Sequence, residues 1–133
     1  MKAGSTKEEQ TQGHFAVTAR VTYLEKESKP EACYYFFSYH IEIKNTSKLA
    51  AQLMSRHWIV TDGDGQVEEV RGAGVVGQQP RIEPGQVFEY ESACPLPTSS
   101  GTMKGTYQMI DSNGNQFDIE IPEFYLVAPS ALH

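Results

Sequence analysis

The residues with the clearest potential for chemistry are three glycines in the stretch GAGVVGQQP, residues 72–80, which form the motif G-x-G-x-x-G. In dinucleotide-binding proteins this spacing forms a tight turn that leads into a helix, whose N-terminal amides bind the pyrophosphate. Arg71 and Arg81 flank the segment with positive charge. The first question is therefore whether these glycines bind phosphate or only let the chain bend.

The residues that follow the motif argue against a phosphate-binding helix. Pro80, Pro84 and Gly85 come directly after it. Because proline lacks an amide donor and keeps the preceding residue out of the helical region, no helix of two turns can begin here. Two interpretations remain. The amides form an anion-binding nest, or the glycines bend a strand while Val75 and Val76 pack.

The other side chains capable of nucleophilic or metal chemistry are isolated in the sequence. The four histidines are His14, His40, His57 and His133, and no H-x-H, H-E-x-x-H or G-x-S-x-G motif occurs. Cys33 and Cys94 form no C-x-x-C pair and are expected to be free thiols, with Cys94 in a loop. We therefore expect no catalytic residue, no metal site and no cofactor, and a protein that is not an enzyme.

Charge and hydropathy exclude two classes of partner. The net charge is −6, and none of the 11 Lys and Arg residues is adjacent to another. Nucleic-acid-binding proteins instead carry a basic patch or stripe, so no nucleic-acid partner is expected. No apolar run approaches the ~20 residues of a membrane helix, and the N-terminus lacks the apolar segment of a secretory signal. A cytoplasmic protein without membrane contact is expected.

Alternating hydrophobicity predicts the elements that would position these residues. Two strands have clear inward faces, formed by Phe15, Val17, Ala19, Val21 and Tyr23 and by Tyr35, Phe37, Tyr39, Ile41 and Ile43. Further strands are predicted at 52–61, 67–71, 87–92, 104–111 and 116–121, with turns at 62–65 and 112–115 and a loop at 94–101. Residues 1–13 are polar and unpatterned, which predicts a flexible arm.

This succession of short strands predicts an all-β fold, an immunoglobulin-like antiparallel β-sandwich of about seven to eight strands. Trp58 lies on the third predicted strand, where immunoglobulin-like domains place a core tryptophan. Tyr107 is likewise expected in the core. Ile41 and Met109 stand roughly where antibody domains carry cysteines, so the sandwich has no disulfide.

Several segments together resemble the ApaG family of small bacterial proteins over roughly residues 14–127. They are SRHWIVTDGDG, EVRGAGVVGQQPRIEPG, FEYESACPL, SGTMKGTYQM and IPEFYL. The loop at 95–100 departs from the family pattern, which has an acidic residue near 97 and a proline near 99. The resemblance implies a fibronectin type III-like sandwich spanning 14–127, with 128–133 as a tail. It also implies a link to cobalt tolerance and magnesium efflux, and similarity to domains of F-box and polymerase-delta-interacting proteins.

These observations predict a non-enzymatic protein-interaction domain with an unidentified protein partner. The candidate binding loop is a bent, largely exposed segment containing Arg71, Gly72, Gly74, Val75, Val76, Gly77 and Gln79. The alternative is a small-ligand module that binds pyrophosphate, a nucleotide or a divalent cation. The sequence is compatible with a monomer or a homodimer, and with either exposed or core positions for the two valines.

Overall fold

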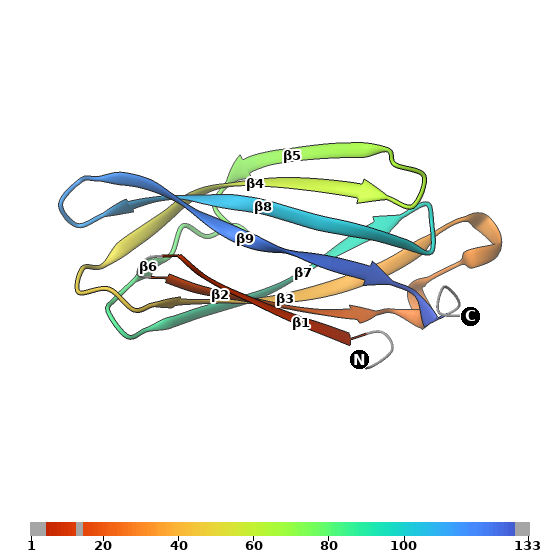
Figure 1. The fold of residues 1–133 in the computed structure, drawn as a ribbon, viewed down its shortest axis with the longest axis horizontal. Helices are drawn as coiled ribbons and strands as arrows, with labels where there is room; N and C mark the ends of the chain where they lie inside the picture. The colour runs from red at the N-terminus through yellow and green to blue at the C-terminus, as the bar shows by residue number, and fades with distance from the viewer. Residues whose placement is uncertain (1–4, 13–14, 130–133) are drawn as a thin grey trace.

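A computed structural model describes residues 5–12 and 15–129 of the chain, which form two antiparallel β-sheets packed face to face (Figure 1). The elements are β1 (Ser5–Gln12), β2 (Phe15–Tyr23), the 3₁₀ helices η1 (Glu25–Glu27) and η2 (Pro30–Ala32), β3 (Tyr35–Asn45), β4 (Ala51–Asp62), β5 (Val67–Ala73), β6 (Arg81–Ile82), β7 (Val87–Leu96), β8 (Ser100–Asp111) and β9 (Gln116–Val127). The predicted all-β sandwich is confirmed.

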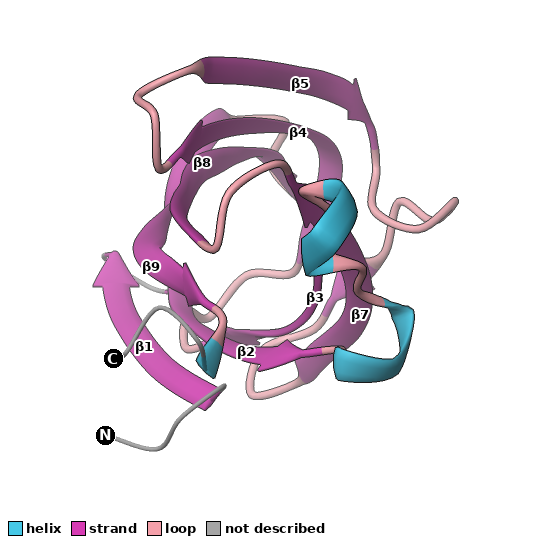
Figure 2. Cartoon of the chain, turned by 90° about the vertical axis from the view of Figure 1, so that its right-hand side faces the viewer, coloured by secondary structure: helices cyan, strands magenta, loops and turns pink. Residues whose placement is uncertain are grey.

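The strand order defines the edges of the two sheets. One has the strand order β1-β2-β3-β7; the other has β5-β4-β8-β9, with β6 paired to β4. Strand β9 contacts both β1 and β2, which closes one side of the sandwich. In the end-on view of Figure 2, β5 lies at the outer border of its sheet. Among the described residues, no helix has the length and apolar character needed to cross a bilayer.

An aromatic cluster around Trp58 forms the centre of the core. The indole ring lies 5.4 Å from the Tyr39 ring of the opposite sheet, 6.4 Å from Tyr107 and 5.9 Å from Phe124. Trp58 is 3% exposed and Tyr107 is fully buried, as the sequence predicts. Edge-to-face geometry of this kind is the preferred arrangement of aromatic pairs.

Two polar groups lie within this core and bond to one another. The hydroxyls of Tyr90 and Tyr107 are 2.5 Å apart. Burial raises the pKa of both phenols above the usual value, because ionisation would place an unsolvated charge between the sheets. The pair therefore stays protonated and gives β7 and β8 a directional contact across the sandwich.

Strand β1 lies within the segment 1–13 for which the sequence predicts a flexible arm. The structure pairs Ser5–Gln12 with β2 along its whole length, from Ser5 opposite Thr22 to Gln12 opposite Phe15. A polar segment without alternation gives no periodic signal, so backbone pairing alone decides this strand. The remaining parts of that arm, His14 and residues 130–133 of the predicted tail lie outside the described residues.

The predicted loop at 94–101 is mostly strand. Strand β7 continues to Leu96 and β8 begins at Ser100, which leaves only 97–99 as the connection. Phe37 and Tyr35 are hydrogen-bonding partners of Cys94 and Leu96, so the nitrogen of Pro95 faces away from β3. Proline is tolerated at such an outward position of an edge strand.

Strand β9 extends beyond its predicted end at residue 121. Pro122 lies where the pairing with β8 shifts, between the Gly105–Ile121 and Met103–Phe124 pairs. The proline thus occupies an irregularity on an edge strand, where it interrupts no ladder hydrogen bond. The extension places Phe124 in the core beside Trp58.

Replacing Trp58 with Ala is expected to reduce the free energy of unfolding by about 3–5 kcal/mol, because it empties the centre of the aromatic cluster. Urea denaturation followed by circular dichroism measures the loss. Tyr125→Ala on the exposed face of β9 is the matched control and should cost less than about 1 kcal/mol. Equal losses for the two variants would contradict the central position of Trp58.

Candidate functional site

The glycine segment forms a tight hairpin after β5 rather than a helix entrance. Val75 and Gln78 exchange backbone hydrogen bonds of 2.8 and 2.9 Å. Val76 and Gly77 lie between them with φ values of 41° and 79°. Positive φ at both central residues is the signature of a type I′ turn, whose preferred sequence is Asn-Gly. After the turn, the chain continues through Pro80 into β6.

The two valines of this hairpin point in opposite directions. Val75 is 1% exposed and belongs to the core, whereas Val76 is 51% exposed. Two-residue turns project their central side chains outward, and the alternation of the flanking strands turns Val75 inward. The candidate loop therefore exposes one valine to solvent, not two.

Two of the glycines lie in close contact with other groups of the protein. The Arg56 guanidinium donates to the carbonyl oxygens of Ala73 and Gly74 at 3.1 and 2.8 Å. A Cβ atom on Gly72 would lie 2.8 Å from this guanidinium, and one on Gly74 would lie 2.1 Å from the backbone oxygen of Gln78. The spacing of these glycines is therefore explained by side-chain and backbone packing.

The same segment is bound to β4 by further hydrogen bonds. The amide of Gly74 donates to the Met54 carbonyl, as does the side-chain amide of Gln79, both at 2.9 Å. The amides of Val75 and Gln78 are also used within the turn. An anion that bound the amides of Gly74, Val75 or Gln78 would have to displace these bonds, which weakens the nest interpretation.

The arginines that flank the segment are each close to a carboxylate. Arg71 Nη2 lies 3.9 Å from Glu69, and Arg81 Nε donates to Glu83 at 2.7 Å. Glu69 also contacts His57 Nε2 at 2.8 Å on the outer face of β4 and β5. Their positive charge is thus partly balanced locally rather than directed at the glycines.

Replacing Gly77 with Ala is expected to cost about 1–2 kcal/mol, because its φ is positive although space around the added methyl is open. Gly74→Ala should cost clearly more, because the added Cβ also collides with backbone. Free energies of unfolding from urea titrations make the comparison. Indistinguishable losses would show that the turn relaxes and that the contact with Gln78 is not a constraint.

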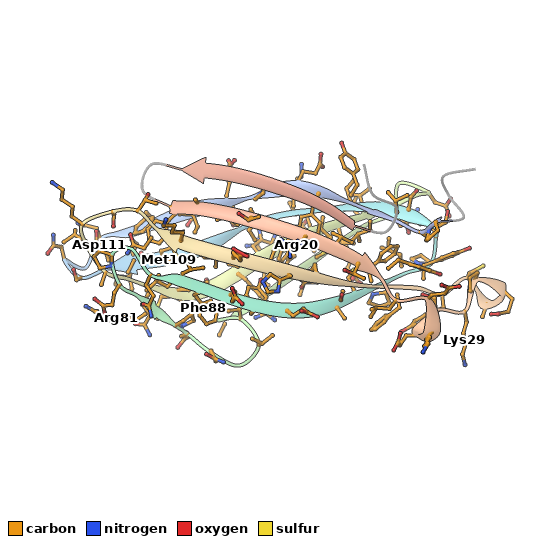
Figure 3. The ribbon with its side chains drawn as sticks, turned by 90° about the horizontal axis from the view of Figure 1, so that it is seen from below. Arg20, Lys29, Arg81, Phe88, Met109 and Asp111 are labelled. Atoms are coloured by element: carbon orange, nitrogen blue, oxygen red, sulfur yellow. The ribbon has the colours of Figure 1, made fainter. Side chains whose placement is uncertain are left out.

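A second group of polar residues lies on the outer face of β3 and β7. One ligand atom each of His40, Glu42 and Glu89 falls within 4.8 Å of the others, and His40 Nδ1 is 3.6 Å from Glu91. Arg20, labelled in Figure 3, is the β2 residue paired with His40. An imidazole and carboxylates are ligands for zinc and similar divalent cations.

Spacing in the sequence indicates only two of these three ligands, His40 and Glu42. Strand alternation predicts His40 and Glu42 on one solvent-facing side, because they are two residues apart. Glu89 becomes their neighbour through the β3–β7 register, in which it pairs with Glu42. That register depends on tertiary packing, so spacing within the sequence carries no sign of the third ligand.

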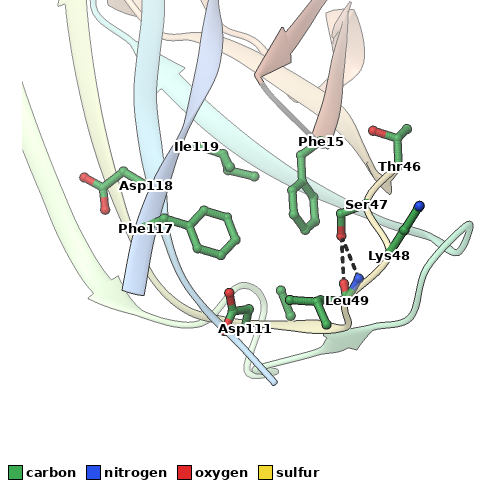
Figure 4. A pocket seen from close by; sticks show the side chains of 10 residues that line it. Phe15, Thr46, Ser47, Lys48, Leu49, Asp111, Phe117, Asp118 and Ile119 are labelled. Atoms are coloured by element: carbon green, nitrogen blue, oxygen red, sulfur yellow. Dashed lines mark hydrogen bonds between the residues drawn. The ribbon is translucent and has the colours of Figure 1, made fainter. Parts of the chain in front are cut away.

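A pocket of about 610 Å³ opens at the end of the sandwich between the start of β2, the β3–β4 connection and the β8–β9 hairpin (Figure 4). Phe15 and Phe117 form apolar walls with ring centroids 5.7 Å apart. Lys48, Asp111 and Asp118 contribute charge to the lining. The volume suits a small molecule, but two carboxylates against one ammonium disfavour a polyphosphate.

The two cysteines lie in different environments. Cys33 is exposed next to η2, whereas Cys94 is buried in β7 rather than in a loop, as a correction to its predicted position. Burial raises the pKa of the Cys94 thiol to about 11, since a thiolate would lack solvation there. Neither cysteine is in a disulfide, which agrees with the predicted free thiols.

The chain is similar to known proteins along most of its length. A family model described as the ApaG domain matches residues 25–111. Protein ApaG of Bdellovibrio bacteriovorus is 58% identical over 119 residues, covering 90% of this chain and 94% of that protein. Protein ApaG of Dechloromonas aromatica is 54% identical over 111 residues, covering 84% of this chain and 87% of that protein.

Solved structures show the same similarity in three dimensions. The crystal structure of a Bordetella pertussis protein described as ApaA superposes with a TM-score of 0.84 at 47% identity, covering 93% of this chain and 98% of that chain. The C-terminal domain of Wzt reaches a TM-score of 0.56 at 9% identity, covering 96% of this chain and 81% of that chain, which shows a shared fold alone.

Proposed function

The chain belongs to the ApaG family, and we propose that it acts in the cytoplasm as a non-enzymatic protein-interaction domain that binds a partner through the hairpin tip at Val76. The cobalt tolerance and magnesium efflux linked to the family would then depend on that partner. The proposal refines the candidate loop, since Val75 is a core residue and Val76 is the apolar group offered to solvent.

The observation that carries the proposal is the conformation of Val76. A β-branched residue at positive φ is a genuine outlier, because its Cβ crowds the backbone. Val76 has φ 41° and is half exposed, so burial of its side chain contributes little free energy to offset the backbone strain. Backbone strain that is not offset by burial of the side chain is typical of residues that bind a ligand or partner.

The surroundings of Val76 suit a small interface. Gln79 and Arg71 are exposed near the same hairpin and give it a polar border. Gly77 leaves open space beside the tip, so a partner can approach the backbone closely. An apolar centre with a polar rim is the usual organisation of a protein interface.

Replacing Val76 with Asn separates binding from stability. Asn-Gly is the preferred type I′ sequence, so the variant should unfold at an equal or higher temperature, with a gain of up to about 1 kcal/mol. The same change should abolish capture of the partner that immobilised wild-type protein retains from a bacterial lysate. Affinity capture with mass spectrometry and thermal denaturation provide the two readouts.

Val87→Asn is the matched control for this experiment, because Val87 is also an exposed valine but lies on β7. It should retain the partner. If Val76→Asn retains the same proteins as wild type, the tip is not the binding surface. If it lowers the melting temperature instead, Val76 serves the fold.

A second candidate function, binding of a divalent cation, is supported by the group around His40. Glu42 and Glu89 are directly opposite one another in a non-hydrogen-bonded pair, where side chains approach most closely. Like charges in that position repel. A cation between these carboxylates, with His40 as a third ligand, would remove the repulsion, although the neighbouring charge of Arg20 opposes it.

Zinc titration tests this candidate. Wild-type protein should show a higher melting temperature as zinc is added, and His40→Gln should not. His57→Gln is the control, since His57 contacts the single carboxylate of Glu69. If zinc does not raise the melting temperature of wild type, or raises it equally in all three proteins, the group is not a cation site.

A further inference from the structure

The exposed edge of β5 carries a sequence that is complementary to itself. The strand reads Val67-Glu-Glu-Val-Arg-Gly-Ala73, and all but Gly72 of its residues are exposed. We propose that β5 pairs with β5 of a second copy of this chain, antiparallel and centred on Val70, so that the two sheets join into one. This inference goes beyond the proposed function: it shares Arg71 with the border of that surface, but Val76 lies outside the strand.

The pairing of β5 with β4 determines which backbone groups are available. The Asp62 amide donates to the Gln66 carbonyl, and the Gly74 amide donates to the Met54 carbonyl. Hydrogen-bonded pairs alternate along an antiparallel ladder, so the backbone N–H and C=O groups of the even-numbered residues of β5 point toward β4. The N–H and C=O groups of Val67, Glu69, Arg71 and Ala73 therefore point to the free edge. The Ala73 carbonyl also accepts from Arg56 and can accept a second bond through its other lone pair.

Only certain registers satisfy these outward groups. Each hydrogen-bonded pair must join two odd-numbered residues, one from each copy. Centring the pair on residue 69 opposes two glutamates, and centring it on residue 71 opposes two arginines. Centring it on Val70 instead pairs Glu69 with the partner's Arg71 twice, and Val67 with the partner's Ala73 twice.

The register centred on Val70 also gives the longest overlap between the two copies of β5. All four outward residues find a partner, whereas the neighbouring registers leave some unpaired. Val70 is 38% exposed, and its side chain would meet its own copy in a non-hydrogen-bonded pair. Val67, 60% exposed, would gain contact with the small Ala73 side chain. Opposite charges and apolar pairs directly across strands both stabilise a sheet.

Two of the other edge strands, β7 and β9, carry features that prevent such pairing. On β7 the outward positions include Pro95, which has no donor, and Glu89 and Glu91, which would oppose each other in overlapping registers. On β9 they include acidic residues and Pro122. Strand β5 contains no proline and carries both signs of charge.

Charge exchange between two variants tests the pairing. Sedimentation velocity of the full chain over a range of concentrations should show a monomer–dimer equilibrium in wild type, weakened by salt. Arg71→Glu alone opposes carboxylates twice, and Glu69→Arg alone opposes guanidinium groups twice. Each should raise the dimer dissociation constant about tenfold or more.

Mixing the two variants should restore association, because every 69–71 contact then joins opposite charges. The double variant Glu69→Arg/Arg71→Glu should dimerise for the same reason. Lys104→Glu and Glu120→Arg, exposed residues of β8 and β9, are the charge-matched controls and should behave as wild type. Rescue in the mixture also shows that both variants are folded.

Three results would overturn the proposal. Wild type could remain monomeric at all concentrations and at low salt. It could dimerise with an affinity that neither substitution at 69 or 71 changes. The mixture of single variants could fail to associate although wild type does.

Discussion

The contact of Trp58 with Tyr39 across the two sheets is the interaction on which the surrounding structure depends. It places Trp58 on the inner face of β4, and strand alternation then decides the direction of its neighbours. Arg56 shares the inner side and reaches the carbonyls after β5. His57 lies on the outer side and contacts Glu69. One buried aromatic pair thus determines which residues of β4 support the glycine hairpin and which face solvent.

The hairpin combines tight constraint at its base with strain at its tip. Arg56 lies across Gly72 and binds two successive carbonyls, while Val75 fills part of the core. These contacts stabilise a short turn that Val76 would not favour by itself. The segment is therefore a rigid projection, and a rigid apolar tip loses little conformational entropy when a partner binds.

Surface charge differs between the strands at the edges of the sandwich. With a net charge of −6, copies of this protein repel one another over most of their surface. The outer face of β3 and β7 concentrates this repulsion in three glutamates around His40. The alternation of Glu69 and Arg71 on β5 is the exception, because it can neutralise itself across a two-fold axis.

Much of the fold and little of the site could be predicted from the sequence. Alternation and turn chemistry predict the inward faces of β2 and β3, the hairpin around 112–115 and the core positions of Trp58 and Tyr107, because each signal is local. The prolines at 80 and 84 exclude a nucleotide-binding helix for the same reason. Strand β1, the extension of β7 through Pro95 and that of β9 through Pro122 depend on partners distant in the sequence. Only tertiary structure decided that Val75 is buried and Val76 exposed, that Arg56 lies against Gly72, and that Glu89 joins His40. These facts depend on the register between strands, which is determined by packing across the whole core rather than by any short stretch of residues.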